Sequence, residues 1–343
     1  MPYTERNNVT VRVPATTTNL GPGVDVLGMA LDIWVEVCVS RADTFSVTCE
    51  GKGLEHMPRD ETNYVVIGLK KIFDKFQKPC PPCSYHIKSE IPYGSGLGSS
   101  SACIVAGLIA GLVLSGTQLP VRNHEMLLQM AAEVEGHVDS VSAAIYGGLQ
   151  LGLHSSGRWR SHRLRFPHGI HCIVLITGTF VNKTELRQEI SKTVPFEDAV
   201  GNIARTALLV EAFSRDNLQL LRFCMDDRLH QFQRSRKLPH LLPAIKAATD
   251  AGAIACWLSG QGPSVCAMTS TRCGDPLTRR ASEGCDEGIA EAMYNVARRL
   301  DMYDARAFVT TPSERGAHIV SADPPFSSGF MRHFGYQAKL SKL

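Results

Sequence analysis

The sequence predicts an α+β fold made of two domains. Strand patterns and helix patterns are mixed in both halves of the chain without strict alternation, which favours α+β over a doubly wound α/β sheet. The 343 residues exceed what one compact core normally holds, and 44% apolar with 20% charged residues is typical of a globular protein. We expect a first domain over residues 1–165, a second over 166–322 and a tail over 323–343.

The first half begins with strands. β-branched residues alternate with polar ones, as in half-buried strands, over 9–14, 32–39 and 44–49. Apolar residues at helical spacing predict a helix over 62–77. A proline-rich turn ends this helix. The further elements expected in this half are a strand over 85–89, an apolar helix over 102–114, helices over 122–135 and 138–146, and strands over 148–154 and 159–165.

The second half is richer in helices. A continuous apolar run over 171–178 predicts a buried strand. Helices are expected over 184–190, 196–213, 216–223, 239–250 and 286–300, and strands over 253–259, 264–269, 305–310 and 316–321. The segment 270–284 is poor in apolar residues, and we expect it to be a loop.

Charge and cysteine content limit the classes of function. Thirty-six basic against 33 acidic residues give a net charge of +3, and no Lys/Arg run is longer than a pair. A nucleic-acid binder that relies on bulk charge is therefore not expected. The longest apolar run, over 102–114, is too short to span a bilayer, so no membrane insertion is expected. Eleven scattered cysteines and a polar beginning favour a reducing compartment over secretion.

The last three residues, Ser341, Lys342 and Leu343, form an S-K-L tripeptide. A terminal S-K-L is the address read by the peroxisomal import receptor. We therefore expect a peroxisome-type organelle, either a peroxisome or a glycosome, and the cytoplasm if the signal is not used.

A glycine-rich loop before the apolar helix predicts a phosphate site. Its sequence, over 92–102, is P-Y-G-S-G-L-G-S-S-S-A. Glycine lets the backbone approach an anion closely, and the helix that follows offers unpaired N–H groups at its N-terminus. The loop is neither a Walker A motif nor a dinucleotide fingerprint. An ordinary glycine turn with a serine cap is the alternative, but the preceding proline and the three serines favour a polyphosphate cradle.

This loop resembles the ATP-binding motif of the GHMP kinase superfamily, and other segments narrow the resemblance to the homoserine kinases. They are V-P-A-T-T-T-N-L-G-P-G-V-D-V-L-G-M-A-L over 13–31, E-G-H-V-D over 135–139 with A-I-Y-G-G over 144–148, D-R-L-H-Q over 227–231 with Arg234, and L-S-G-Q-G-P-S over 258–264. The resemblance implies a first domain similar to domain 2 of ribosomal protein S5 and a ferredoxin-like second domain.

The resemblance also implies ATP and Mg²⁺ as cofactors. Ser100 and Glu135 would hold the metal, which prefers hard oxygen ligands. Asn63 would contact the nucleotide base. The ATP-binding residues implied in full are Asn63, Pro92, Gly94, Ser95, Gly96, Leu97, Gly98, Ser99, Ser100, Ser101, Lys183 and Thr184.

The substrate implied is L-homoserine, phosphorylated to O-phospho-L-homoserine, the precursor of threonine. Asp25 would take its ammonium, because an unpaired ammonium in a cleft is costly, and arginine forks would hold its carboxylate. Asp139 would position the substrate or act as a base. The substrate-binding residues implied are Asn19, which would orient the hydroxyl, Asp25, His137, Asp139, Arg187, Arg234 and Gly260, with Asp139, Asn19 and Arg187 as catalytic candidates.

Two positions depart from the family pattern. The family usually has Asp-Asn where this chain has Asp139-Ser140, and serine offers one donor where asparagine offers two. A family threonine near the γ-phosphate aligns with Lys183, and Thr184 follows one residue later.

Two other functions stay open: a GHMP kinase for a different small alcohol, and a non-catalytic interaction protein with this fold. Asp25 together with Arg187 and Arg234 favours an amino-acid zwitterion, since mevalonate, for example, needs no ammonium partner. The glycine loop and the metal ligands favour catalysis. A homodimer is a further expectation.

Overall fold

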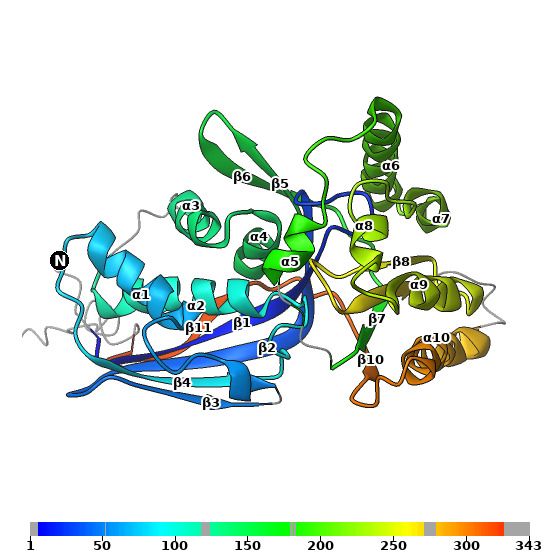
Figure 1. Cartoon of the computed structure of the whole chain (residues 1–343). Coiled ribbons are helices and arrows are strands. Elements are labelled where there is room, and N and C mark those ends of the chain that lie inside the picture. The colour runs from blue at the N-terminus through cyan, green and yellow to red at the C-terminus, as the bar shows by residue number, and fades with distance from the viewer. Residues whose placement is uncertain are drawn as a thin grey trace, which may run out of the picture.

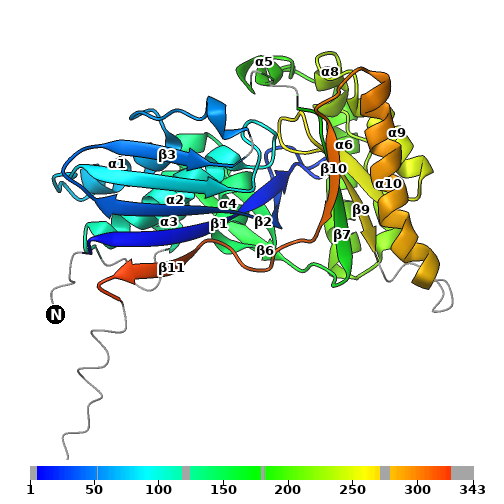
Figure 2. The same cartoon turned by 90° about the horizontal axis from the view of Figure 1, so that it is seen from below.

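The computed structural model describes residues 6–51, 53–117, 124–178, 181, 183–270 and 279–325, without the side chains of residues 124, 183, 184 and 279–284. Two β-sheets lie side by side, and helices cover them (Figures 1 and 2). The tripeptide Ser341-Lys342-Leu343 lies outside the described residues.

The first sheet has seven strands in the order β11-β1-β2-β4-β3, with β5 pairing β2 and β6. The strands are β1 (Asn8–Thr18), β2 (Leu27–Arg41), β3 (Ser46–Glu50), β4 (Cys83–Ser89), β5 (Leu149–Ser155), β6 (Arg158–Leu164) and β11 (His318–Asp323). Its helices are α1 (Tyr64–Lys75), α2 (Ser99–Leu114), α3 (His124–Glu135) and α4 (Asp139–Tyr146), with the short 3₁₀ helix η1 (Leu54–His56). Helices α1 to α4 cover one face of the sheet (Figure 1).

Strand β1 is longer than the predicted 9–14. Val9, Val11 and Val13 alternate into the core, as the pattern predicts. Pro14 lies where the register with β2 shifts, which is where a proline is tolerated inside a sheet. Beyond this bulge the strand continues to Thr18 and delivers its end to the site described below.

The glycine-loop helix is buried on all sides and packs closely on α1. A Cβ on Gly107 would lie 2.1 Å from the carbonyl oxygen of Val65, so only glycine allows this approach. Helix α1 also joins β3 to β4, which pair in parallel and therefore need a crossover between them. This packing fixes the direction in which α2 presents its N-terminus.

The second sheet has four antiparallel strands in the order β10-β7-β9-β8, the 4-1-3-2 order of a ferredoxin-like domain. The strands are β7 (Ile170–Ile176), β8 (Ala255–Leu258), β9 (Val265–Ser270) and β10 (Arg306–Thr310). The helices are α5 (Lys183–Gln188), α6 (Phe196–Ser214), η2 (Leu218–Leu220), α7 (Leu221–Cys224), α8 (Gln231–Ser235), α9 (Leu241–Asp250) and α10 (Arg279–Arg299). Helices α9 and α10 pack on one face (Figure 2).

The α+β prediction is confirmed, and the structure corrects it in detail. Strand β11 was placed in the second domain, but it returns to the first sheet and pairs with β1. Helix α10 begins at Arg279, inside the predicted loop 270–284, whose residues 271–278 lie outside the described part. The predicted helix 216–223 is two short pieces, η2 and α7. Helix α8 was not predicted, because five residues are too few to show helical periodicity.

Among the described residues, no helix is both long and apolar enough to cross a bilayer. All ten cysteines described are free thiols, Cys80 and Cys83 included.

Candidate functional site

Several segments that are far apart in the sequence line one cavity between the two sheets. They are the end of β1, the loop 19–26, the glycine loop, the first turn of α2, the junction of α3 and α4, helix α8 and the turn 259–262. The residues lining this central cavity are Thr16, Thr18, Asn19, Asp25, Gly96, Gly98, Ser100, Ser101, Glu135, His137, Asp139, Ser140, Arg234, Gly260 and Gln261.

The glycine loop is held against the second domain by its backbone. Gly96 has φ +83°, and a Cβ there would lie 2.5 Å from the carbonyl oxygen of Ser259. The Ser259 hydroxyl donates to the Gly96 carbonyl at 2.9 Å, and the N–H of Ser264 donates to the Ser95 carbonyl at 3.1 Å. The loop is therefore preformed in the left-handed conformation that glycine tolerates.

The other residues of this loop differ in what they can offer. Leu97 is fully buried in the core, so only its backbone is available to a ligand. The Ser95 hydroxyl donates to the Pro92 carbonyl at 2.8 Å. Ser99, Ser100 and Ser101 form the first turn of α2, where backbone N–H groups have no acceptor within the helix. These N–H groups and the positive end of the helix dipole suit a phosphate.

A second cavity, of about 480 Å³, lies at the start of the glycine loop. Both domains line it, and the sequence reasoning had singled out only the loop residues among its walls. The lining residues are Gly53, Glu55, His56, Pro92, Tyr93, Gly94, Ser95, Ile176, Gly178, Pro263, Asp304 and Arg306.

Ser100 and Glu135, the predicted metal ligands, lie side by side in the structure. The Ser100 hydroxyl donates to Glu135 Oε1 at 2.9 Å, and both residues line the central cavity. A hydroxyl and a carboxylate oxygen beside a phosphate cradle form the small, hard donor set that Mg²⁺ uses when phosphates supply its other ligands. Among the described residues, no group of three or more His, Cys, Asp and Glu side chains is arranged to hold a metal.

Asp139 is buried at the first position of α4, with 1% of its surface exposed. Its Oδ1 accepts the N–H of Ser140 at 2.8 Å and lies 2.7 Å from Nδ1 of His137. Burial favours neutral His137, but the hydrogen bond and charge of Asp139 outweigh burial and raise the pKa of His137. The imidazolium form is therefore favoured beside the Asp139 carboxylate.

Ser140, the first departure from the family pattern, has a defined partner. Its Oγ accepts a hydrogen bond from the Ser101 hydroxyl at 2.9 Å. The bond joins the first turn of α4 to the first turn of α2, so this serine connects the Asp139 segment to the glycine-loop helix.

Asp25 and Arg187, predicted to bind opposite ends of one ligand, bind each other in the structure. Arg187 Nη1 donates to Asp25 Oδ1 at 2.9 Å, and Nη2 donates to Oδ2 at 2.7 Å. Burial by itself raises the pKa of Asp25, but the guanidinium outweighs burial and lowers it. The same pairing, working against burial, raises the pKa of Arg187. Since both side chains are partly exposed, solvent weakens this ion pair.

Arg234 is different, because it is completely buried. Nη1 contacts Nδ1 of His230 at 3.1 Å and the Gly260 carbonyl at 3.3 Å, and Nε donates to the Leu186 carbonyl at 3.4 Å. Nη2 is buried and has no hydrogen-bond partner among the described residues, although the side chain lines the central cavity. Burial lowers the pKa of Arg234 to about 10, which still leaves it charged at neutral pH. A buried guanidinium with a free nitrogen suits an anionic ligand.

Asn19 was predicted to orient the substrate hydroxyl, but in the structure its side chain binds two backbone groups. Its Nδ2 donates to the Gly260 carbonyl at 2.7 Å, and its Oδ1 accepts the N–H of Asp25 at 3.1 Å. Asn19 lines the cavity, but these two bonds make it a brace that holds Asp25 and the 259–262 turn in place.

Asn63 does not support the predicted contact with a nucleotide base. It is 1% exposed and caps α1, accepting the N–H of Val65 at 2.9 Å and donating to the Pro58 carbonyl at 2.7 Å. Lys183 and Thr184 lie in the first turn of α5, and their side chains lie outside the described part of the structure.

The sequence reasoning missed the buried polar residues that support the site. Asp227 and His230 stood in a quoted motif without a role, and Asn202 in α6 was not noted at all. The available signal was position: Asn202 stands seven residues before Leu209, on the apolar face of a long helix, where a polar residue is unusual. Asn202 is buried and binds Asp227.

Comparisons with known proteins agree with the motifs. The family model of the GHMP kinase N-terminal domain matches residues 63–148, and that of the GHMP kinase C-terminal domain matches residues 209–283. A homoserine kinase of Desulfitobacterium hafniense is 35% identical over 312 residues, 91% of this chain and all of the relative. One from Streptomyces coelicolor is 37% identical over 78% of this chain and 87% of the relative.

Solved structures give the same result for the fold. The crystal structure of homoserine kinase from Cytophaga hutchinsonii has a TM-score of 0.78 at 26% identity, covering 92% of this chain and 98% of the other. A mevalonate kinase of L. major has a TM-score of 0.63 at 14% identity, covering 90% of this chain and 96% of the other, a likeness of fold alone. Identity over most of both chains, the matched domains and the ordered motifs together show that this chain belongs to the homoserine kinase family of GHMP kinases.

Proposed function

We propose that the protein transfers the γ-phosphoryl group of ATP to the hydroxyl of L-homoserine, giving ADP and O-phospho-L-homoserine, the precursor of threonine. One observation carries the proposal. Arg234, with a buried unpartnered Nη2, and the carboxylate of Asp25 line the same cavity as the glycine loop. An α-amino acid brings a carboxylate and an ammonium at a fixed spacing, and this cavity offers a partner of opposite charge for each.

ATP would lie along the glycine loop. The first turn of α2 would receive the phosphates through its N–H groups, and the second cavity, at the start of the loop, would receive the nucleoside. The phosphate chain would then end near Ser100, beside the central cavity. The contributions of Lys183 and Thr184 stay predictions.

Mg²⁺ would be held by Ser100 and Glu135, whose oxygens already face each other. When bound, the metal supplies charge neutralisation for the phosphates. The protein's own part is to keep these two oxygens at the junction of the cradle and the substrate cavity.

Homoserine would place its carboxylate on Arg234 and its ammonium on Asp25. Arg187 now occupies both oxygens of Asp25, so ligand binding requires Arg187 to release at least one of them. The released guanidinium is then free to join Arg234 on the carboxylate. The buried fork of Arg234 needs no such exchange, and we expect it to give the larger share of the binding free energy.

Asp139 would position the substrate hydroxyl. Its carboxylate is held in one place, because Oδ1 accepts the N–H of Ser140 and lies 2.7 Å from Nδ1 of His137. Phosphoryl transfer through a loose transition state gains most from positioning and charge neutralisation, so the reaction does not require a strong base.

A coupled assay of ADP release tests the function. The protein is incubated with Mg-ATP and, in separate reactions, homoserine, serine, threonine and mevalonate. We expect turnover that depends on homoserine. Turnover with mevalonate instead would favour a GHMP kinase for another alcohol, and a folded sample without any alcohol-dependent turnover would favour the non-catalytic alternative.

Two expectations about partners stay predictions. Deleting Ser341-Lys342-Leu343 from a fluorescently tagged chain should change punctate staining to diffuse staining if the tripeptide is a targeting signal. An unchanged pattern would remove the import receptor as a partner.

Light scattering of the purified protein tests the homodimer.

A further inference from the structure

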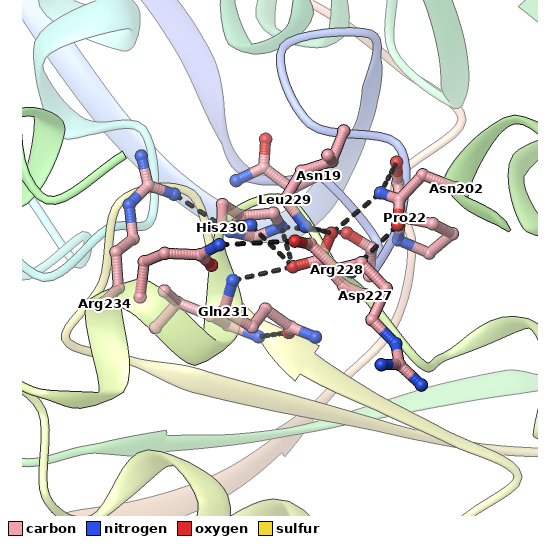
Figure 3. Close-up of polar contacts among 12 residues, drawn as sticks. Asn19, Pro22, Asn202, Asp227, Arg228, Leu229, His230, Gln231 and Arg234 are labelled. Carbon is pink, nitrogen blue, oxygen red and sulfur yellow. Dashed lines mark hydrogen bonds and ion pairs between the residues drawn. The ribbon is translucent and has the colours of Figure 1, made fainter. Parts of the chain in front are cut away.

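His230 lies beside Arg234 (Figure 3) and also contacts the loop that carries Asp25. The side chain is completely buried. Its Nε2 lies 2.9 Å from the carbonyl oxygen of Gly21, which belongs to the loop that carries Asp25. Its Nδ1 lies 3.1 Å from Nη1 of Arg234. One imidazole ring therefore touches both the ammonium side and the carboxylate side of the site.

The two partners of His230 determine its tautomer. A carbonyl oxygen only accepts, so Nε2 must carry the hydrogen, and a guanidinium only donates, so Nδ1 must be the acceptor. Complete burial lowers the pKa of His230, partly offset by the charge of Asp227. The ring is therefore neutral, and a second proton would turn the acceptor that faces Arg234 into a like charge.

A buried hydrogen-bond network holds the backbone at His230 in place. Asp227 Oδ2 accepts the backbone N–H of His230 at 2.9 Å, which fixes the start of α8. Nδ2 of Asn202 contacts Asp227 Oδ1 at 2.8 Å and the Pro22 carbonyl at 3.1 Å, so α6 holds the same two segments together. Figure 3 shows these contacts converging between the loop at Pro22 and the start of α8.

We propose that His230 is a positioning residue that sets the spacing between the carboxylate-binding Arg234 and the ammonium-binding loop of Asp25, and so makes the site specific for an α-amino acid head group. The inference rests on the proposed function and deepens it. His230 acts through Arg234 and Gly21 and is not a catalytic residue. Its effect should therefore appear in the binding of the head group and leave ATP binding unchanged.

Two variants separate the two bonds of the ring. His230→Gln can place an amide N–H near Gly21 but presents no acceptor to Arg234, whereas His230→Asn can place an oxygen near the position of Nδ1. We expect His230→Gln to raise KM for homoserine about tenfold, as for one lost hydrogen bond to a charged group. His230→Asn should recover part of this loss. KM for ATP should change less than about twofold in both, since the glycine loop is untouched.

An analogue gives the readout that a merely structural role would not move. 3-Amino-1-propanol has the hydroxyl and the ammonium of homoserine but no carboxylate, so it makes no use of Arg234. Its kcat/KM should be low and the same in the unaltered protein and in His230→Gln. The preference for homoserine over this analogue should therefore fall about tenfold in the variant.

His240→Gln is the matched control. His240 is also buried, and its Nε2 also lies near a backbone carbonyl, that of Pro263, at 2.8 Å. Its Nδ1 has no hydrogen-bond partner in the part of the chain that the structure describes. We expect this variant to lose thermal stability without a selective change in KM for homoserine.

Three results would overturn the inference: an unchanged KM for homoserine in folded His230→Gln, equal losses with homoserine and 3-amino-1-propanol, or the same selective loss in His240→Gln. If the His230 variants do not fold, ¹⁵N-histidine NMR of the unaltered protein decides, because a charged ring or an Nδ1–H tautomer for His230 contradicts it. If the unaltered protein does not turn over homoserine at all, the proposed function fails instead.

Discussion

The phosphate side and the amino-acid side of the central cavity are built in different ways. The phosphate side is one contiguous segment, the glycine loop and the first turn of α2, and it works mainly through its backbone. The amino-acid side combines Asp25, Arg187, Arg234 and His230, which come from both domains. A backbone site is encoded locally and is rigid, whereas a site of charged side chains depends on tertiary contacts and can exchange partners.

Gly96→Ala should have the largest effect, because it changes the backbone of the glycine loop on the phosphate side. The new Cβ must displace the Ser259 carbonyl, and the alanine must adopt φ +83°. We expect ATP-dependent turnover to fall at least about 100-fold, and the free energy of unfolding to fall by more than the roughly 1–2 kcal/mol that the left-handed conformation alone costs. Steady-state kinetics and urea unfolding measure both.

Gly157→Ala is the control for that change. Gly157 has φ +71° in the β5–β6 turn, but a Cβ there meets no atom of the described residues within 4 Å. This variant should lose only the cost of the left-handed conformation and keep its turnover. Equal effects in the two variants would show that the close approach of the loop to Ser259 is unimportant.

Arg234→Lys should come next, since it leaves the charge on the amino-acid side but removes the fork. We expect KM for homoserine to rise roughly 10- to 100-fold, with KM for ATP unchanged, because hydrogen bonds to charged groups are worth about 1.5–3 kcal/mol. Arg228→Lys is the control, because Arg228 lies near Arg234 in the chain but is exposed and pairs with Asp226. Comparable KM values for Arg234→Lys and the unaltered protein would contradict the assignment of the carboxylate to Arg234.

Asp139→Asn tests a residue of the cavity where the phosphate side and the amino-acid side meet. As a positioning residue, Asp139 should account for about tenfold in kcat, whereas loss of a general base removes roughly 10²–10⁴. The pKa of His137 should at the same time fall, because the hydrogen bond and charge of Asp139 no longer oppose burial. ¹³C-histidine NMR across pH measures this change.

The raised pKa of His137 determines how the free energy of unfolding depends on pH. In the unaltered protein, the contribution of the charged ring to the free energy of unfolding is complete below the ordinary pKa of 6.5 and is lost as the pH rises through the raised value. Asp139→Asn should abolish this loss of stability. A loss of kcat in the range of a general base would identify Asp139 as the base and contradict the positioning role.

Ser140→Ala should have the smallest effect. It removes the hydrogen bond from Ser101 and leaves Asp139 in place, so we expect a loss of about 0.5–1.5 kcal/mol in the free energy of unfolding and a modest change in kcat. Thermal unfolding and kinetics check both values. A large loss of kcat with normal stability would mean that Ser140 itself touches the reacting groups.

The difference between the two sides also decides what the sequence could predict. The sequence could predict the glycine loop before α2, because its chemistry is local, and the proximity of Ser100 and Glu135 follows from two motifs; their roles toward ATP and Mg²⁺ stay predictions. The alternation of Val9, Val11 and Val13 likewise predicted β1. The binding of Arg187 to Asp25 could not be predicted, because it depends on how α5 lies against the loop 19–26.

Other differences between the sequence predictions and the structure have the same physical cause. Asn63 and Asn19 were assigned to ligands through the family resemblance, whereas in the structure backbone groups nearby occupy their amides. The role of His230 depends on contacts with Gly21 and Arg234, and no pattern within the segment 227–234 reveals the first of these. The return of β11 to β1 was missed because strand periodicity does not say which sheet a strand joins.

That return of β11 has a consequence for biogenesis. The register Asn8↔Asp323 pairs the first described strand with the last, across the whole second domain. During synthesis, the edge of β1 stays open until residues 318–323 have left the ribosome, and an open strand edge is a template for association with other chains. Completion of the first sheet is therefore among the latest steps in assembling the native protein, and a chain stopped after α10 presents that edge permanently.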